Sequence, residues 1–143
     1  MLKNVSPIVS PDLLKTLCEM GHGDELVIAD GNFPAFAYSS KIVRLDGLEI
    51  PNILKAILNL IPLDIYVKHP VSLMQVVPGD EILPTIWDDY EKIIEESNEP
   101  FNEFEFIDKF GFYERAKKAY ATVTTSESAL YANIIIKKGI ITV

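Results

Sequence analysis

The residues best suited to acid–base chemistry are residues 21–24, which read GHGD, and Asp30 a short distance further on. A histidine side chain has an unperturbed pKa of about 6.5, so His22 can accept or donate a proton near neutral pH. The glycines that flank it allow unusual backbone angles, through which a small molecule can approach the imidazole ring. Such a turn also occurs as an ordinary surface feature, so the residues alone leave both interpretations open.

The elements that hold these residues are a helix and the strand that follows it. Ser10 can cap a helix over residues 11–20, a proline suits its first turn, and the next glycine can end it. Residues 26–29 (LVIA) form a short apolar run, which is typical of a strand buried on both faces of an α/β sheet. Asp30 would then follow the carboxyl end of this strand, where ligands usually bind in open α/β sheets.

The remaining elements are expected from hydrophobic periodicity and from the prolines and glycines that interrupt it. Helical spacing predicts helices at residues 51–61, from residue 84 past residue 94, and at 111–118. Alternating or β-branched runs predict strands at residues 41–45, 71–77, 104–108, 120–124 and 131–136. The close succession of strand, helix and strand after residue 104 favours a parallel βαβ unit, so the sequence predicts the α/β class.

Composition narrows the range of partners. With 143 residues and 48% hydrophobic content, the chain fits one domain over residues 1–143. A net charge of -8 would repel a phosphate backbone, so nucleic acid and anionic membrane surfaces are poor partners and a small neutral ligand fits better. The sequence shows no apolar run long enough to cross a bilayer and no signal-peptide pattern, so we expect a cytoplasmic protein.

Other reactive side chains are expected to be structural. Cys18 lies among leucines on a helical pattern and is expected in the core. The acidic residues of the helix after residue 84 are expected on its solvent face rather than around a cation. Only two histidines occur, with no paired cysteines and no phosphate-binding glycine loop, so no metal and no cofactor is expected. The second histidine, His69, is interpreted as a loop residue.

The carboxyl-terminal residues 140–143 (IITV) continue the apolar character of the preceding strand to the end of the chain. Such a tail is adhesive when exposed, so either the sheet or a neighbouring subunit must bury it. The mean hydropathy of +0.17 favours a subunit interface and therefore a homo-oligomer.

Four separated blocks of the sequence resemble the L-fucose mutarotases, the sister branch of the D-ribose pyranases. The blocks are residues 21–25 (GHGDE), 29–35 (ADGNFPA), 112–119 (FYERAKKA), and 131–133 (YAN) with Lys138-Gly139. The resemblance covers nearly the whole chain in order, and the third block resembles the fucose branch in particular. It implies an isomerase that interconverts the α and β anomers of L-fucose by acid–base catalysis, with no cofactor.

The resemblance also implies roles for individual residues. His22 would transfer the proton, and Asp30 would bind a sugar hydroxyl or hold the imidazole in its working tautomer. Tyr120, at the start of an expected strand, would supply a phenol as a second proton relay; a core tyrosine is the alternative interpretation.

The ending of the chain would contact the sugar. An amide side chain such as that of Asn133 both donates and accepts hydrogen bonds, and the ring of Tyr131 can cover an apolar sugar face. Ala132 would contribute its backbone. Lys109 stands where the family usually has arginine, and an ammonium group cannot reproduce the planar guanidinium fork. Lys109 is therefore either a substrate contact or a solvent-exposed lysine.

The fold and assembly of the family complete the expectation. It implies a three-layer α/β/α domain with a mainly parallel central sheet, assembled into ring-shaped decamers whose active sites lie where neighbouring subunits meet. Two alternatives stay open: a D-ribose pyranase-like activity, and a non-catalytic monosaccharide-binding subunit that uses the same pocket. His22 favours the enzyme, because recognition of a neutral sugar needs no titratable group.

Overall fold

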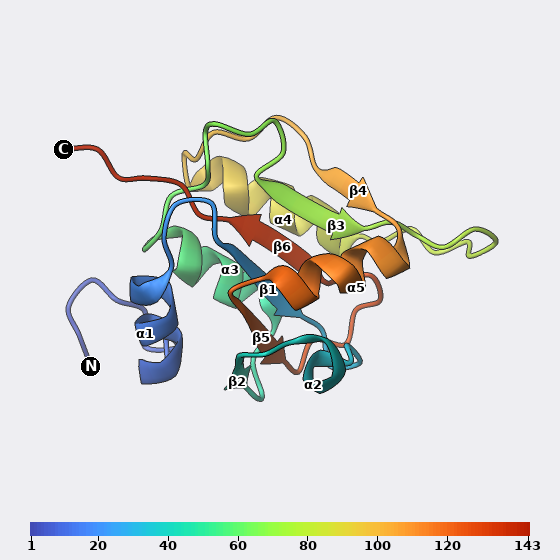
Figure 1. Cartoon of the computed structure of the whole chain (residues 1–143), viewed down its shortest axis with the longest axis horizontal. Coiled ribbons are helices and arrows are strands. Elements are labelled where there is room, and N and C mark those ends of the chain that lie inside the picture. The colour runs from blue at the N-terminus through green and yellow to red at the C-terminus, as the bar shows by residue number, and fades with distance from the viewer.

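A six-stranded sheet lies at the centre of the protein, with helices on both of its faces (Figure 1). The structure is a computed structural model that describes residues 1–143. The helices are α1 (Pro11–Glu19), α2 (Ala35–Tyr38), α3 (Ile50–Leu58), α4 (Ile86–Glu96) and α5 (Lys109–Lys118). The strands are β1 (Glu25–Ala29), β2 (Ile42–Leu45), β3 (Val71–Met74), β4 (Glu105–Ile107), β5 (Ala121–Thr125) and β6 (Ile134–Lys137).

The strand order in the sheet is β2-β5-β1-β6-β3-β4. Strands β2, β5 and β1 pair in parallel, as do β3 and β4, whereas β6 pairs antiparallel with both β1 and β3. All strands except β6 therefore point the same way. The predicted mainly parallel α/β sheet is confirmed, and β4 and β5 run parallel on either side of the α5 crossover, with three strands between them.

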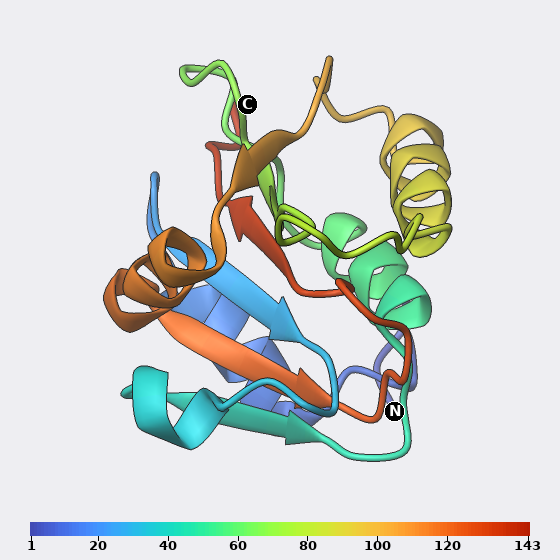
Figure 2. The same ribbon diagram turned by 90° about the vertical axis from the view of Figure 1, so that its right-hand side faces the viewer.

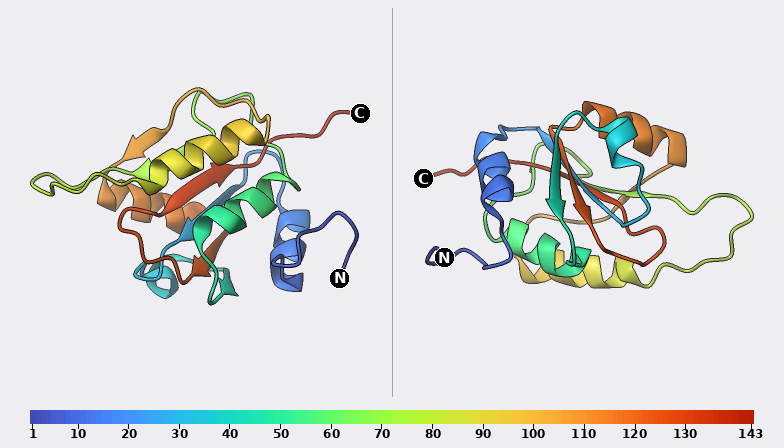
Figure 3. Two further views of the ribbon diagram at one scale, coloured as in Figure 1. Left: turned by 180° about the vertical axis from the view of Figure 1, so that it is seen from behind. Right: turned by 90° about the horizontal axis from the view of Figure 1, so that it is seen from below.

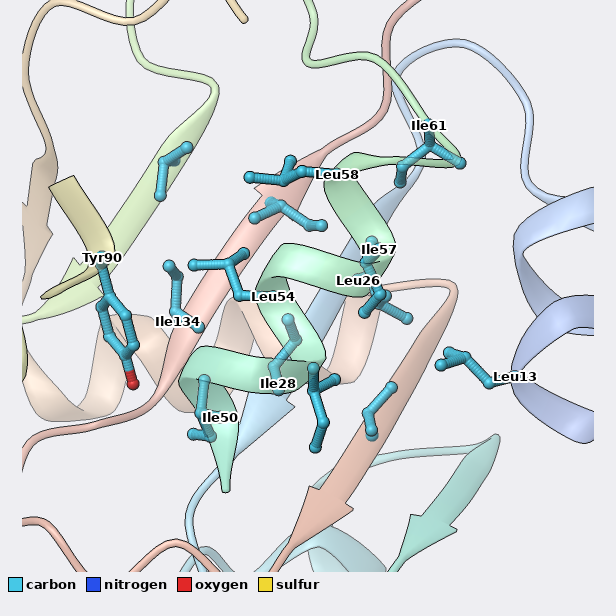
Figure 4. Close-up of a cluster of buried hydrophobic side chains, with 14 of the residues drawn as sticks. Leu13, Leu26, Ile28, Ile50, Leu54, Ile57, Leu58, Ile61, Tyr90 and Ile134 are labelled. Atoms are coloured by element: carbon cyan, nitrogen blue, oxygen red, sulfur yellow. The ribbon is translucent and has the colours of Figure 1, made fainter. Parts of the chain in front are cut away.

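Strand β1 is buried on both faces, as its apolar run predicts. Leu26 and Ile28 face the larger core cluster, which α1, α3 and α4 share with the sheet (Figure 4). Val27 and Ala29 face a smaller cluster built mainly on α5. Figure 2 shows α3 and α4 on one side of the sheet and α2 and α5 on the other, which gives the expected three layers.

Helix α1 begins and ends where the sequence predicts, within a residue. The Ser10 hydroxyl caps it by accepting a hydrogen bond from the amide of Leu13 at 3.1 Å. The expectation for Cys18 is wrong, since this residue is exposed. Leu13 and Leu17 turn inward on this amphipathic helix, and a residue one position after Leu17 is rotated away from the core.

Two other expectations need correction. Short helix α2 follows Pro34 and was not predicted. Strand β6 begins at Ile134 rather than at Tyr131, because Tyr131 has a φ of 58°, outside the range of a strand.

The apolar tail, residues 140–143, joins no strand and extends from the body as an exposed segment (Figure 3). Among the helices there is none long and apolar enough to span a lipid bilayer.

Candidate active site

Polar residues converge at the edge of the sheet where the parallel strands end. Asp30 follows the carboxyl end of β1, and Asn133 precedes β6, which runs the opposite way, so the two residues lie side by side. The backbone N–H of Asp30 donates to Oδ1 of Asn133 at 2.8 Å. They line a pocket of about 280 Å³, together with Asn32, Phe33, Pro34, Met74, Val77, Asp80, Lys109, Tyr113, Leu130 and Tyr131.

The volume of this pocket is near the lower limit for ligand sites, which is roughly 300 Å³. It therefore suits a single small ring. The lining mixes apolar side chains with amide, carboxyl, phenol and ammonium groups. That mixture fits a small neutral molecule that carries several hydroxyl groups.

The carboxylate of Asp30 is largely buried, and its Oδ1 accepts a hydrogen bond from the amide of Asn32 at 2.9 Å. Burial raises the pKa of Asp30, and the negative charge of Glu127 raises it further, whereas the amides of the following turn lower it. Asp30 thus offers acceptor oxygens toward the pocket at a site where its ionisation is disfavoured.

Helix α5 contributes the other wall. Asp108 caps α5 by accepting a hydrogen bond from the amide of Gly111, which places Lys109 in the first turn of the helix. The ammonium of Lys109 lies 5.8 Å from the centroid of the Tyr113 ring. Burial raises the pKa of the Tyr113 phenol, so this group remains a hydrogen-bond donor at neutral pH.

His22 lies at the opposite edge of the sheet from this pocket. Its turn is fixed by a hydrogen bond from the Gly23 amide to the Lys138 carbonyl at 2.8 Å, and Gly23 needs its positive φ of 84° there. The five residues of β1 separate the turn from Asp30, and at about 3.3 Å per residue they span roughly 16 Å. Within one chain, His22 and Asp30 therefore cannot contact each other.

A buried carboxylate orients the His22 ring. Nε2 of His22 lies 3.1 Å from Oδ1 of Asp64, which also accepts a hydrogen bond from the Tyr66 amide at 3.0 Å. The Tyr66 ring packs against the imidazole with a centroid separation of 5.5 Å. Burial alone would raise the pKa of Asp64, but the Tyr66 amide and His22 hold it below its usual value. The carboxylate that holds the imidazole in this chain is Asp64 and not Asp30.

Tyr120 lies just before β5, also at the amino edge of the parallel strands. Its hydroxyl donates to Oε2 of Glu19 at 2.7 Å and accepts from Nζ of Lys41 at 3.3 Å. The hydrogen bonds from Lys41 and then Tyr120 are the main causes that lower the pKa of Glu19 to about 2. The structure joins Tyr120 neither to the pocket nor to His22.

The remaining reactive groups form no further centre. No three His, Cys, Asp or Glu side chains are grouped so that they could hold a metal ion. The acidic side chains of α4 point outward as predicted. His69 lies between Glu103, at 3.2 Å, and Glu105, at 3.9 Å.

Comparison with known proteins identifies the family. Residues 3–141 match the model of the RbsD / FucU transport protein family. The chain belongs to this family. An L-fucose mutarotase from Actinobacillus pleuropneumoniae serotype 5b (strain L20) is 48% identical over 140 residues, which cover 98% of this chain and 97% of that protein. A fucose mutarotase from Homo sapiens is 45% identical over 146 residues, which cover 98% and 94% respectively.

A solved structure agrees with the fold over nearly the whole length of both chains. It is the crystal structure of the fucose mutarotase from Streptococcus pneumoniae in complex with L-fucose. Its TM-score is 0.94 at 50% sequence identity, and the match covers 99% of this chain and 100% of that one.

Sequence reasoning missed several residues of these sites, among them Tyr113, Asp80 and Asp64. Tyr113 lies inside the FYERAKKA block, so the block itself carried a signal for it. Asp80 follows the Pro-Gly pair that ends the expected strand at residues 71–77, and such a turn signal does not indicate a functional role. Asp64 lies 42 positions from His22, and no local pattern relates the two residues.

Proposed function

We propose that this protein is an L-fucose mutarotase that interconverts the α and β anomers of the sugar. The observation that carries the proposal is the full-length match to a fucose mutarotase in complex with L-fucose. The small pocket lined by Asp30 and Asn133 also supports the proposal, because its polar groups fit a molecule with several hydroxyl groups. Residues 1–143 act as a single sugar mutarotase domain.

Proton transfers are the only help that the reaction needs from the protein, since they accompany the cleavage and re-formation of one C–O bond. A proton leaves the anomeric hydroxyl, another reaches the ring oxygen, and the bond between that oxygen and the anomeric carbon breaks. The open-chain aldehyde then rotates and closes again with its other face toward the attacking hydroxyl. Because one acid and one base suffice, no metal and no cofactor enters the proposal.

His22 is the proposed proton-transfer residue. With Asp64 as an ionised acceptor, the Nε2–H of His22 is held by that carboxylate, and Nδ1 is left free to exchange a proton with the sugar. This is the arrangement in which a buried carboxylate fixes both the tautomer and the orientation of an imidazole. Tyr120 stays a second candidate for the proton relay.

The pocket residues bind the sugar in this proposal. Asp30 and Asn133 bind hydroxyl groups, Tyr131 covers an apolar face of the ring, and Ala132 contributes its backbone. Lys109 contacts a hydroxyl at the rim. Tyr113 adds a phenolic donor next to it.

The separation of His22 from the pocket requires a second copy of the chain. One subunit supplies His22 and Asp64, and its neighbour supplies the pocket at the carboxyl edge of the strands. Exposed apolar side chains occur at both edges: Ile65 and Tyr66 beside His22, and Phe110 and Leu130 beside the pocket. The proposed assembly is a homo-oligomer, a decamer as in the family resemblance, with one site at each such contact.

The proposal keeps the predicted cytoplasmic location. Cys18 is an exposed free thiol, and such a group persists in a reducing compartment.

Saturation-transfer NMR of L-fucose tests the proposal directly, because it measures exchange between the two anomer signals without a coupled assay. Exchange should rise in proportion to added protein. Exchange that stays at the rate in buffer, in a folded sample that binds L-fucose, would support the non-catalytic binding subunit instead. The same measurement with D-ribose distinguishes a pyranase, for which ribose would be the faster substrate.

A further inference from the structure

The segment that the proposal places against the sugar is held by helix α4. The backbone of Tyr131 lies in the left-handed region, which a tyrosine rarely adopts, so neighbouring groups must hold it there. The indole Nε1 of Trp87 donates to the Tyr131 carbonyl at 2.8 Å. The Tyr90 hydroxyl donates to the carbonyl of Ala132 at 2.6 Å. Neither Trp87 nor Tyr90 lines the pocket itself.

We propose that Trp87 and Tyr90 are positioning residues, which hold residues 131–133 in the shape that contacts the sugar. The inference rests on the proposed function, because that function makes these residues a sugar-contacting segment. Both donors bind backbone carbonyls and so leave the side chains of Tyr131 and Asn133 to the pocket. Because two successive carbonyls are held by the same helix, the backbone direction of residues 131–133 is fixed relative to α4.

Helix α4 is a firm support for these two hydrogen bonds. Tyr90 and Ile94 are fully buried, and Figure 4 shows Tyr90 beside Ile134 of β6 at the edge of the large apolar cluster. Burial raises the pKa of the Tyr90 hydroxyl, so this group stays protonated and remains a donor at any pH at which the enzyme works.

The other end of Tyr131 is held by the loop that leads into α4. The Tyr131 hydroxyl donates to Oδ2 of Asp80 at 2.6 Å and accepts from the Val77 amide at 3.3 Å. Helix α4 and the loop before it therefore hold both the backbone and the phenol of the same residue. A change in α4 reaches the pocket through this residue without any contact between α4 and the sugar.

Three substitutions on α4 and at its end test the assignment. Trp87→Phe removes the indole N–H and keeps an aromatic ring, and Tyr90→Phe removes one hydroxyl group. Ser97→Ala is the matched control, because the Ser97 hydroxyl also donates to a carbonyl, that of Ile94, but not to the segment. Anomer exchange is measured against L-fucose concentration and against pH, together with urea denaturation.

The two phenylalanine variants should bind the sugar more weakly. Loosening residues 131–133 weakens binding of substrate and transition state alike, so half-saturating L-fucose should rise roughly three- to tenfold. The saturated exchange rate and its pH profile depend on His22 and should stay close to wild type. Ser97→Ala should keep the wild-type half-saturating concentration even where it lowers stability.

Fluorescence gives a second measurement, since Trp87 is the only tryptophan in the chain. Added L-fucose should change the emission of the wild type, and Tyr90→Phe should need a higher sugar concentration for half of that change. Unchanged half-saturation in both phenylalanine variants, or an equal rise in Ser97→Ala, would overturn the assignment while the proposed function stands.

A wild-type protein that neither binds L-fucose nor speeds anomer exchange would overturn the proposed function instead. Deuterium uptake by the backbone amides of residues 128–133 then decides the positioning role without any sugar. Faster uptake in Trp87→Phe and Tyr90→Phe than in Ser97→Ala supports it, and equal uptake in all three variants overturns it.

Discussion

At the scale of single residues, the pairing of His22 with Asp64 decides which imidazole nitrogen is available. Asp64 is only 3% exposed and its pKa lies below the usual value, so it is an anion at neutral pH. In the proposed mechanism it accepts the Nε2–H of His22 and so leaves Nδ1 to face the sugar. The His22 side chain itself is 46% exposed, so it contributes little to the core.

Replacing His22 should therefore separate activity from stability. We expect His22→Ala to lower anomer exchange about 100- to 10,000-fold, the range typical of a positioned acid–base group. Urea denaturation should show a loss of only about 0.5–1.5 kcal/mol, the contribution of one hydrogen bond, because Asp64 keeps the Tyr66 amide as a donor. Near-normal exchange in this variant would contradict the role of His22 and make Tyr120 the next residue to replace.

The raised pKa of Asp30 predicts that replacing this side chain with a neutral one increases the stability of the protein at neutral pH. A carboxyl group whose pKa is higher in the folded state destabilises that state when it ionises. The loss is absent below the unfolded pKa of 3.8, grows as pH rises, and is complete above the folded pKa. Asp30→Asn removes the charge and keeps an acceptor for the Asn32 amide.

We expect Asp30→Asn to be more stable than the wild type at pH 7, with the difference fading as pH falls toward 4. Half-saturating L-fucose should rise roughly 10- to 100-fold, because a hydrogen bond to a charged group is lost. Urea denaturation at several pH values and anomer exchange measure the two effects. A variant that is less stable than the wild type at pH 7 would contradict the interpretation.

At the scale of elements, local patterns predicted most of the fold, whereas the predicted pocket residues other than Asp30 were expected from the family resemblance. The apolar run of β1 and the cap of α1 specify their own conformation, so both were placed almost to the residue. Asp30 was predicted at a carboxyl strand end for the same reason. The left-handed Tyr131 and the four-residue α2 carry no such pattern, and contacts distant in sequence fix them. The contacts of His22 with Asp64 and Tyr66 could not be predicted either, because these residues are also distant in sequence.

Helix α3 offers a test of such a distant contact. Its N-cap residue, Glu49, makes no capping hydrogen bond through its side chain. Glu127, which is 6% exposed, replaces that cap by accepting from the amide of Ile50 at 3.2 Å and from that of Ala129 at 2.9 Å. Its negative charge also lies at the positive end of the helix dipole.

We expect Glu127→Ala to lower the free energy of unfolding by about 2–4 kcal/mol, because two amide donors lose their acceptor. Glu127→Gln keeps an acceptor oxygen, so it should lower the free energy of unfolding by less than Glu127→Ala. Urea denaturation of the two variants measures the difference. Equal stability of the wild type and Glu127→Ala would show that water replaces the carboxylate at no cost.

At the scale of the whole molecule, the two halves of the proposed site face away from each other. The turn with His22 precedes β1 and lies near the exposed carboxyl-terminal tail (Figure 1), whereas the pocket lies at the carboxyl end of β1, where Asp30 and Asn133 meet. A contact that joins unlike edges of two copies is heterologous, and it leads to a ring when the rotation closes. Such an interface would also cover the exposed Ile65, Tyr66, Phe110 and Leu130.

This geometry predicts that two impaired variants restore each other when anomer exchange is measured well below half-saturating L-fucose. His22→Ala keeps an intact pocket, and Asp30→Ala keeps an intact His22 with its Asp64 partner. If the two chains are co-expressed in equal amounts and assemble at random, about one quarter of the interfaces combine two intact halves, so about a quarter of the wild-type activity should return.

The matched control mixes His22→Ala with Asp64→Ala, because both changes damage the same half of the site and no interface can then be complete. The purified mixtures are compared by anomer exchange, and light scattering after size exclusion gives the mass of each assembly. Wild-type activity in a particle of 16.0 kDa, the mass of one chain, would contradict the shared site. Recovery in the first mixture and none in the control would instead assign His22 and Asp30 of each working site to different subunits.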